Sequence, residues 1–169
     1  SVYEQLGKGG FRYLYEKGIV YENAHHRHAN TETVVGHATL ATGADPADHG
    51  MIGNIWFDKE LNRVVYNIED DRYPLIGEGG GVDKSAEMDP TQKLAGTDGR
   101  SPAAMLSTTF SDELALRTNG QAKIFGVSVK DRGAVTMAGH AGKAFWFSKA
   151  KGEFISKEGD PMHSKVIIK

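Results

Sequence analysis

Residues 31–58 begin Thr-Glu-Thr-Val-Val-Gly-His-Ala-Thr-Leu-Ala-Thr-Gly, continue through Pro46 to Gly50, and end Gly-Asn-Ile-Trp-Phe-Asp. Before this stretch, residues 18–24 (GIVYENA) alternate and are rich in β-formers, which predicts a strand. Within it, residues 34–41 are small and apolar, which predicts a short helix that stops at Gly43. Thr33 is therefore expected where the strand gives way to the helix.

A hydroxyl at position 33 would face the free N–H groups and the positive dipole end of the helix, a location suited to an anion such as phosphate. Taken alone, the motif favours the simpler interpretation that Thr33 is an N-cap. Asn54 changes that balance. It follows Gly50 and Gly53, glycines let a backbone approach a ligand closely, and its amide could donate hydrogen bonds to an anion held at Thr33.

Composition limits the classes of function. The 169 residues are enough for one core, and 39% hydrophobic and 25% charged residues are ordinary for a globular domain. A net charge of −2 implies no general affinity for nucleic acid, so phosphate binding would depend on a few placed groups. The absence of cysteine excludes disulfides and a cysteine nucleophile. No apolar run approaches membrane-spanning length.

A second candidate motif is Lys130-Asp131-Arg132-Gly133. It follows residues 122–129, a nearly continuous apolar run that predicts a strand covered on both faces. That run in turn follows a predicted helix, residues 109–116, which opens with a capping-box pattern. Helix then buried strand favours a parallel α/β sheet, whose ligands lie at the carboxyl ends of the strands. Lys130 and Arg132 suit a phosphoryl group there, although a charged β-turn explains the motif alone about as well.

The rest of the chain predicts hairpins at 52–57/63–68 and 144–148/153–156, and short helices at 2–6 and 13–16 and from Pro102 to Leu106. Residues 77–100 predict a flexible loop insertion. The acidic residues of this loop, Asp83, Glu87 and Asp89, could bind a cation, although solvated loop charges are the favoured interpretation.

The sequence also contains two groups of histidines. A zinc site could form among the clustered His25, His26 and His28, but a polar strand end is the favoured interpretation. Three further histidines are interpreted as structural: His37, His49 and His140.

The ordered series Thr-x-x-Gly-His-Ala-Thr, Thr-Gly, Pro, His-Gly, Gly-Asn and Trp-x-Asp within residues 33–58 resembles the alkaline phosphatase superfamily. It is most similar to the branch with a threonine nucleophile, which is related to the type I phosphodiesterases and nucleotide pyrophosphatases. Residues 9–14 (GGFRYL) and 130–134 (KDRGA) match the same pattern. The resemblance covers roughly residues 9 to 156.

The resemblance implies an α/β fold: part of an alkaline-phosphatase-like α/β/α sandwich, with a mixed or mainly parallel sheet and added β-hairpins. Residues 1–169 would form one partial domain, and residues 157–169 depart from the family pattern. The family's other metal ligands, aspartates and histidines, would lie outside this chain. The chain is therefore expected to be a fragment or a degenerate homologue.

For function, the resemblance implies phosphomonoester hydrolysis in the full-length protein. Thr33 would be the nucleophile and a ligand to one of two zinc ions, while Asn54, Lys130 and Arg132 would bind the substrate. The alternatives are a phosphodiesterase or nucleotide pyrophosphatase, and a non-catalytic phosphate- or partner-binding fragment. The expected partner is a small-molecule phosphate ester, with no nucleic acid or membrane. Family members suggest a periplasmic or secreted protein. The isolated chain is expected to bind no zinc tightly and to be inactive.

Overall fold

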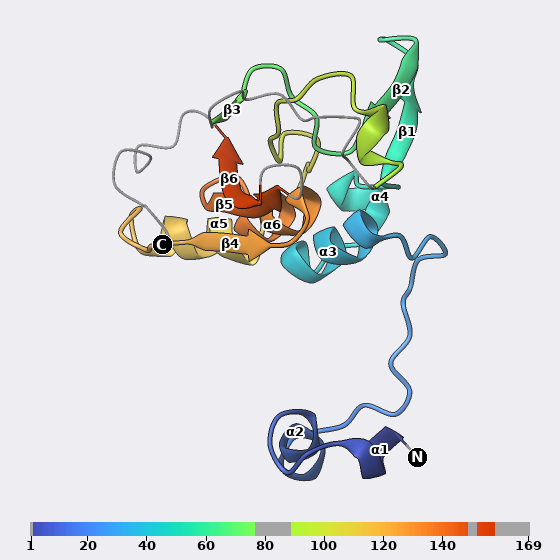
Figure 1. Cartoon of the computed structure of the whole chain (residues 1–169), viewed down its shortest axis with the longest axis vertical. Helices are drawn as coiled ribbons and strands as arrows, with labels where there is room; N and C mark the ends of the chain where they lie inside the picture. Colours follow the sequence, from blue (N-terminus) through green and yellow to red (C-terminus); the bar gives the residue numbers. More distant parts are fainter. Residues whose placement is uncertain (1, 77–88, 149–151, 158–169) are drawn as a thin grey trace.

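The computed structural model describes residues 2–76, 89–148 and 152–157 (Figure 1). In these residues the helices and strands follow the order α1 (Val2–Gln5), α2 (Phe11–Lys17), α3 (Thr33–Thr42), α4 (Pro46–His49), β1 (Ile55–Asp58), β2 (Arg63–Tyr66), β3 (Leu75–Ile76), the 3-10 helix η1 (Gln92–Leu94), α5 (Phe110–Arg117), β4 (Phe125–Ser128), α6 (Asp131–Ala138), β5 (Lys143–Ser148) and β6 (Glu153–Lys157).

The described strands form two sheets. One has the order β3-β6-β5-β4, and the other is the hairpin β1-β2. Strands β4 and β5 are parallel and are connected through α6, whereas β5-β6 and β3-β6 are antiparallel. Of the two sheet types expected from the sequence, the described residues form the mixed one. Both predicted hairpins are confirmed, although the turn residues 149–151 lie outside the described residues.

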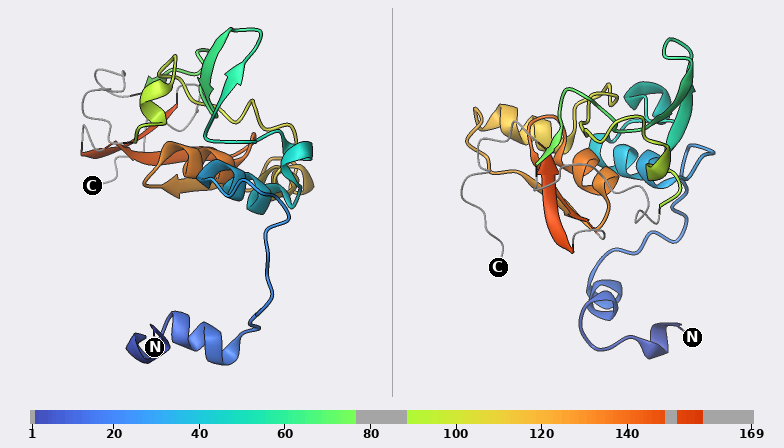
Figure 2. Two further views of the ribbon diagram at one scale, coloured as in Figure 1. Left: turned by 90° about the vertical axis from the view of Figure 1, so that its right-hand side faces the viewer. Right: turned by 45° about the horizontal axis from the view of Figure 1, so that its top comes forward.

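Helix α6 packs against strands β4 and β5 and against α3, as Figure 2 shows. Small residues make this close packing feasible, because alanine and valine faces let helix and sheet backbones approach. At Gly126 of β4, an added Cβ would lie 2.2 Å from the carbonyl oxygen of Ala134, so only glycine fits. The core is formed by buried residues of these elements and their neighbours: Val34, Val35, Ala38, Met51, Tyr66, Ile68, Ala95, Met105, Ala134, Val135, Ala138, Ala144, Trp146 and Ile155.

The expectation that residues 122–129 form a strand covered on both faces is wrong. Strand β4 spans only Phe125–Ser128, and its Gly126 faces α6. Phe125, Val127 and Val129 are 46%, 64% and 61% exposed. An apolar run predicts that both faces of a strand are buried. In the described residues, however, α6 covers only one face of β4.

Residues 18–24 do not form the predicted strand. In Figures 1 and 2 they belong to an extended segment that joins α1 and α2 to the body of the molecule, from which these two helices stand apart. Ile19 and Tyr21 are 83% and 76% exposed. Alternation produces a strand only where a partner edge is present, and no described strand pairs with this segment.

Of the loop predicted at 77–100, the structure describes residues 89–100. Residues 77–88, with Asp83 and Glu87, lie outside the described residues. Within these residues η1 forms, and Gln92 and Ala95 are buried. The backbone of Arg100 forms an isolated antiparallel β-bridge with that of Glu69. The polar composition predicted a solvated loop, but the Arg100 side chain is only 1% exposed. Its burial is possible because it forms an ion pair with Asp131.

Two helix starts predicted from proline and threonine have opposite outcomes. The prediction of a helix from Pro102 to Leu106 is wrong. The chain instead makes a single turn, in which the Met105 N–H donates to the Pro102 carbonyl at 2.9 Å. The capping box at Thr109 is confirmed. The Thr109 hydroxyl accepts from the Asp112 N–H, while the Asp112 carboxylate accepts from the Thr109 N–H. Asp112 also accepts from His140, which supports a structural role for that histidine.

His49 is fully buried and neutral. Its Nδ1 accepts from the backbone N–H of Met51 at 3.1 Å, so the ring proton is on Nε2, which lies 3.1 Å from Thr39 Oγ1. Burial lowers the pKa of His49, and the neighbouring His28 lowers it further. These contacts agree with the structural role predicted for His49.

This burial predicts a pH dependence of stability. Because the pKa of His49 is lower in the folded state, its contribution is complete above the unfolded pKa of about 6.5 and is lost as the pH falls below that value. Urea unfolding at several pH values should therefore show less acid destabilisation for His49→Gln than for the wild type. Identical pH profiles for the two proteins would contradict the prediction.

Candidate active site

Lys130 and Arg132 lie at the junction between β4 and α6. Lys130 is the extended N-cap residue of α6, with φ −112° and ψ 142°, and Asp131 is the first helical residue. The β-turn alternative is therefore wrong. Helix α6 itself was not predicted from the sequence, because Gly133 in its first turn weakens the helical pattern. Lys130 is half-exposed, while Arg132 is 3% exposed.

Both cations contact the same carboxylate. Asp89 Oδ2 accepts from Lys130 Nζ at 2.7 Å and from Arg132 Nη2 at 2.8 Å. Its Oδ1 accepts from the N–H and the hydroxyl of Thr91 at 3.0 and 2.6 Å. Burial raises the pKa of Asp89, but the bonds from Lys130 and Thr91 and the charge of Arg132 outweigh it, so the pKa lies well below its usual range. Asp89 is therefore not the solvated loop charge that the sequence suggested.

A buried polar network contacts the Arg132 side chain. Asp131, fully buried, accepts from Tyr66 OH and from Arg100 Nε, each at 2.8 Å. The Tyr66 hydroxyl accepts in turn from Arg132 Nη1 at 3.3 Å. Burial, and then the charge of Asp131, raises the pKa of Tyr66, so its hydroxyl stays protonated and donates to the carboxylate. The network thus links the orientation of Arg132 to a buried ion pair. Sequence reasoning missed Tyr66 and Arg100.

Thr33 is the first residue of α3, and Glu32, not Thr33, is the N-cap residue. The N-cap interpretation of Thr33 is therefore wrong, and its side chain is exposed. Asn54 lies against the same turn, because its Oδ1 accepts from the Val34 N–H at 3.1 Å. This bond orients the Asn54 amide so that Nδ2 is its remaining donor group. Glu32, which sequence reasoning also missed, accepts from the backbone N–H of Asn54.

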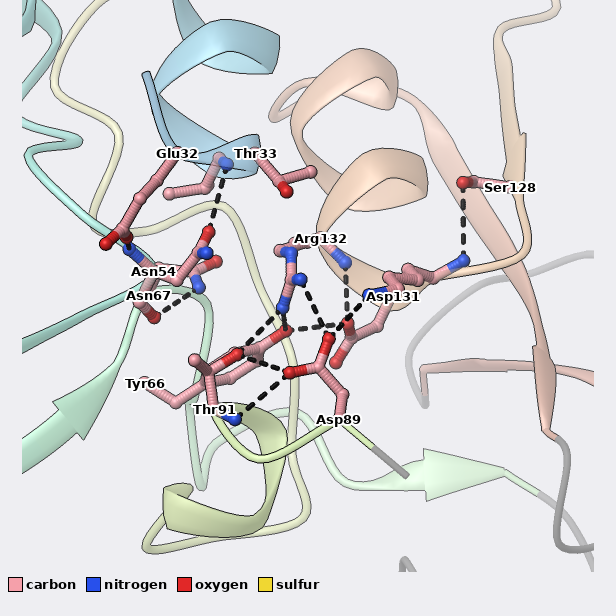
Figure 3. Close-up of polar contacts among 12 residues, drawn as sticks. Glu32, Thr33, Asn54, Tyr66, Asn67, Asp89, Thr91, Ser128, Asp131 and Arg132 are labelled. Atoms are coloured by element: carbon pink, nitrogen blue, oxygen red, sulfur yellow. Dashed lines mark hydrogen bonds and ion pairs between the residues drawn. The ribbon is translucent and has the colours of Figure 1, made fainter. Parts of the chain in front are cut away.

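The first turns of α3 and α6 are neighbours. His37 donates from Nδ1 to the Thr33 carbonyl at 2.7 Å, and an added Cβ at Gly133 would lie 3.4 Å from His37 Nε2. Figure 3 shows Thr33, Asn54 and Arg132 around one region between the two helix starts. Among the described residues, no side-chain hydrogen bond joins Thr33 or Asn54 to Lys130 or Arg132. Two separate sets of polar side chains therefore flank this region.

The described residues contain no group of three or more histidines, aspartates or glutamates arranged to hold a metal ion. His26 and His28 are neighbours, with ring centroids 5.1 Å apart, but they lie on the extended segment rather than on a strand. The described residues alone therefore do not fit a complete zinc site. Within the same ranges, no helix combines the length and the apolar character that crossing a bilayer requires.

Comparisons with known proteins show the family of this chain. Residues 3–151 match the family model of the type I phosphodiesterases and nucleotide pyrophosphatases, so the chain belongs to that family. Among curated relatives, alkaline phosphatase PafA of Elizabethkingia meningoseptica is 37% identical over 91% of this chain and 26% of its own length. Alkaline phosphatase PhoV of Synechococcus elongatus is 38% identical over the same shares. The chain thus spans about a quarter of these relatives.

Solved structures show the fold. The crystal structure of wild-type PafA matches with a TM-score of 0.77 and 36% identity, covering 92% of this chain and 27% of that one. A PafA variant with a threonine replaced by serine, and an asparagine, a lysine and an arginine replaced by alanine, also has a TM-score of 0.77, at 33% identity over 92% and 28% of the two chains. The chain therefore has part of an alkaline-phosphatase-like α/β fold, as the sequence predicted.

Proposed function

We propose that this chain forms the nucleophile and phosphate-binding part of a phosphomonoesterase of the alkaline phosphatase type. The observation that carries the proposal is the pair Lys130 and Arg132, held on one carboxylate oxygen beside the helix start of Thr33. Donors that converge on one oxygen at 2.7–2.8 Å match the oxygens of a phosphoryl group. The names of the curated relatives support hydrolysis of phosphoric esters.

In the proposed reaction, Thr33 Oγ1 loses its proton to solvent and attacks phosphorus. The bond from phosphorus to the ester oxygen breaks, the leaving oxygen takes a proton from water, and a covalent phosphothreonine remains. Water then cleaves the phosphothreonine and releases inorganic phosphate. Lys130 and Arg132 stabilise the charge that develops on the non-bridging oxygens, and Asn54 Nδ2 donates to another oxygen. The exposed position of Thr33 and the fixed orientation of the Asn54 amide support these roles.

The two zinc ions implied by the family resemblance are part of the proposal for the whole protein. Thr33 is the metal ligand proposed in this chain, and the other ligands would come from residues outside it. Bound metal would lower the pKa of the threonine hydroxyl and so supply the nucleophile. Binding and orienting the phosphoryl group are the roles assigned to this chain's own residues.

The PafA variant supports the choice of these four residues. Its substituted threonine and asparagine are separated by the same number of positions as Thr33 and Asn54. Its substituted lysine and arginine have the same two-residue step as Lys130 and Arg132. The same four residue types therefore recur in the same order, and with the same local spacing, in a chain of similar fold.

A second candidate function is cleavage of phosphodiesters or nucleotide pyrophosphates, which the name of the matching family favours. A non-catalytic, phosphate-binding role is the third. The proposed ligand is a small-molecule phosphate ester, with no nucleic acid or membrane partner. The whole protein is proposed to be periplasmic or secreted, by analogy with the family.

The monoester and diester proposals differ in what the cations contact. A monoester dianion offers three terminal oxygens and about two charges, whereas a diester offers two such oxygens and one charge. We expect Lys130→Ala to lower kcat/KM roughly tenfold or more for an aryl phosphate and less for the matched diester. The measurement compares both substrates in the full-length protein, with the exposed Lys123→Ala as a control. Equal losses on both substrates would favour the diesterase.

A further inference from the structure

Asp89 lies at the edge of the Arg132 guanidinium that is best placed for an anion. Arg132 Nη1 donates to Tyr66 OH at 3.3 Å and to Thr91 Oγ1 at 3.0 Å, so this end of the fork is held by neutral groups. Nη2 donates to Asp89. The buried Nε has no acceptor among the described residues. Nε and Nη2 form one edge, through which a guanidinium can bind an oxyanion in a bidentate manner.

Asp89 also changes the charge of the site. Lys130 and Arg132 together carry two positive charges, and the Asp89 carboxylate, 2.7 and 2.8 Å from them, cancels one. An oxygen of a bound phosphoryl group would need the same two donors. The carboxylate therefore occupies, within the protein, the contacts that the proposed substrate and product would make.

We propose that the Asp89 carboxylate competes with the phosphoryl group for Lys130 and Arg132 and so weakens retention of inorganic phosphate. This inference rests on the proposed function. The alternative role for Asp89 would be to orient Lys130 and Arg132 for the substrate, in which case its removal would weaken phosphate binding. Arg132 also contacts Tyr66 and Thr91 through Nη1, and its side chain is almost completely buried, so we expect it to stay in place when Asp89 is neutralised.

The test is Asp89→Asn in the full-length protein, with binding of inorganic phosphate measured by titration calorimetry. An asparagine can keep its one carbonyl oxygen for Thr91 and turn its NH₂ group, which accepts nothing, towards the cations. Phosphate should then bind about tenfold more tightly, because the cations are released from a charge-assisted contact. Asp71→Asn, which removes an exposed carboxylate, is the control and should leave the affinity unchanged.

Lys130→Ala, measured in parallel, separates this inference from the proposed function. Weaker phosphate binding in Lys130→Ala, together with tighter binding in Asp89→Asn, is the expected result. If Lys130→Ala weakens binding but Asp89→Asn leaves it equal or weaker, the competing role of Asp89 is overturned and the phosphate site stands. Tighter binding in Asp71→Asn as well would reduce the effect to net charge and overturn the inference. If Lys130→Ala has no effect, the proposed phosphate site is itself wrong.

Discussion

Replacing Thr33 by alanine in the full-length protein is expected to lower kcat for monoesters and diesters alike by about four orders of magnitude or more, the scale seen when an enzyme nucleophile is removed. Both proposed reactions require the same attacking hydroxyl. The measurement is kcat on matched aryl mono- and diester substrates. Thr33 is exposed at the start of α3, and its side chain donates no hydrogen bond among the described residues. The substitution should therefore leave the stability nearly unchanged.

The matched control is Thr33→Ser, which keeps a hydroxyl at the same position. It should retain most of the activity, because serine and threonine oxygens are comparable nucleophiles. The Thr33 assignment would be contradicted if Thr33→Ala kept activity comparable to that of Thr33→Ser. It would also be weakened if the alanine variant unfolded at a lower urea concentration, since lost structure would then explain lost activity.

The second large effect is on stability and concerns Asp131. Asp131 and Arg100 form an ion pair at 2.8 Å, with side chains 0% and 1% exposed. Asp131→Ala would leave the Arg100 cation buried without its carboxylate, although its Nη1 would keep the carbonyls of Thr97 and Gly99. Breaking a buried pair in this way costs about 3–5 kcal/mol of unfolding free energy. Urea denaturation measures this loss.

An exposed ion pair in the same chain provides the control. Arg27 and Asp45 lie 3.3 Å apart with side chains 84% and 36% exposed, so Arg27→Ala should cost less than about 1 kcal/mol. A loss for Asp131→Ala no larger than that for Arg27→Ala would show that the buried network does not support the fold. Tyr66→Phe, which removes the hydroxyl between Asp131 and Arg132, is expected to have an intermediate effect.

Local patterns predicted the elements that local contacts stabilise. Helix α3 ends at Gly43, whose φ of 69° favours glycine, and the signal lies within one turn. The capping box at Thr109 depends on two residues three positions apart. Both hairpins have alternating apolar residues around turn-forming residues. In each case the atoms that interact are close in the sequence, so the pattern contains the information.

The missed features depend on contacts between distant residues. Asp89 binds Lys130 across 41 positions, and Arg100 binds Asp131 across 31. No local spacing in the sequence indicates these pairs. Asp89, which lies in a polar segment, was therefore interpreted as a solvated charge. The strand expected at 18–24 failed for a related reason, since a strand requires a partner edge and no described strand supplies one. The proposed site residues Thr33, Asn54, Lys130 and Arg132 are predicted from family motifs and not from long-range geometry.

The central claim is that Thr33 receives the phosphoryl group. Its most direct test is acid quenching of the full-length protein during turnover of an aryl phosphate, followed by peptide mass spectrometry. The account predicts a peptide that is heavier by one phosphoryl group, with the modification on Thr33, and its absence from Thr33→Ala. A phosphoryl group on another residue, or none in a protein that turns over substrate and is quenched before the intermediate decays, would contradict the assignment.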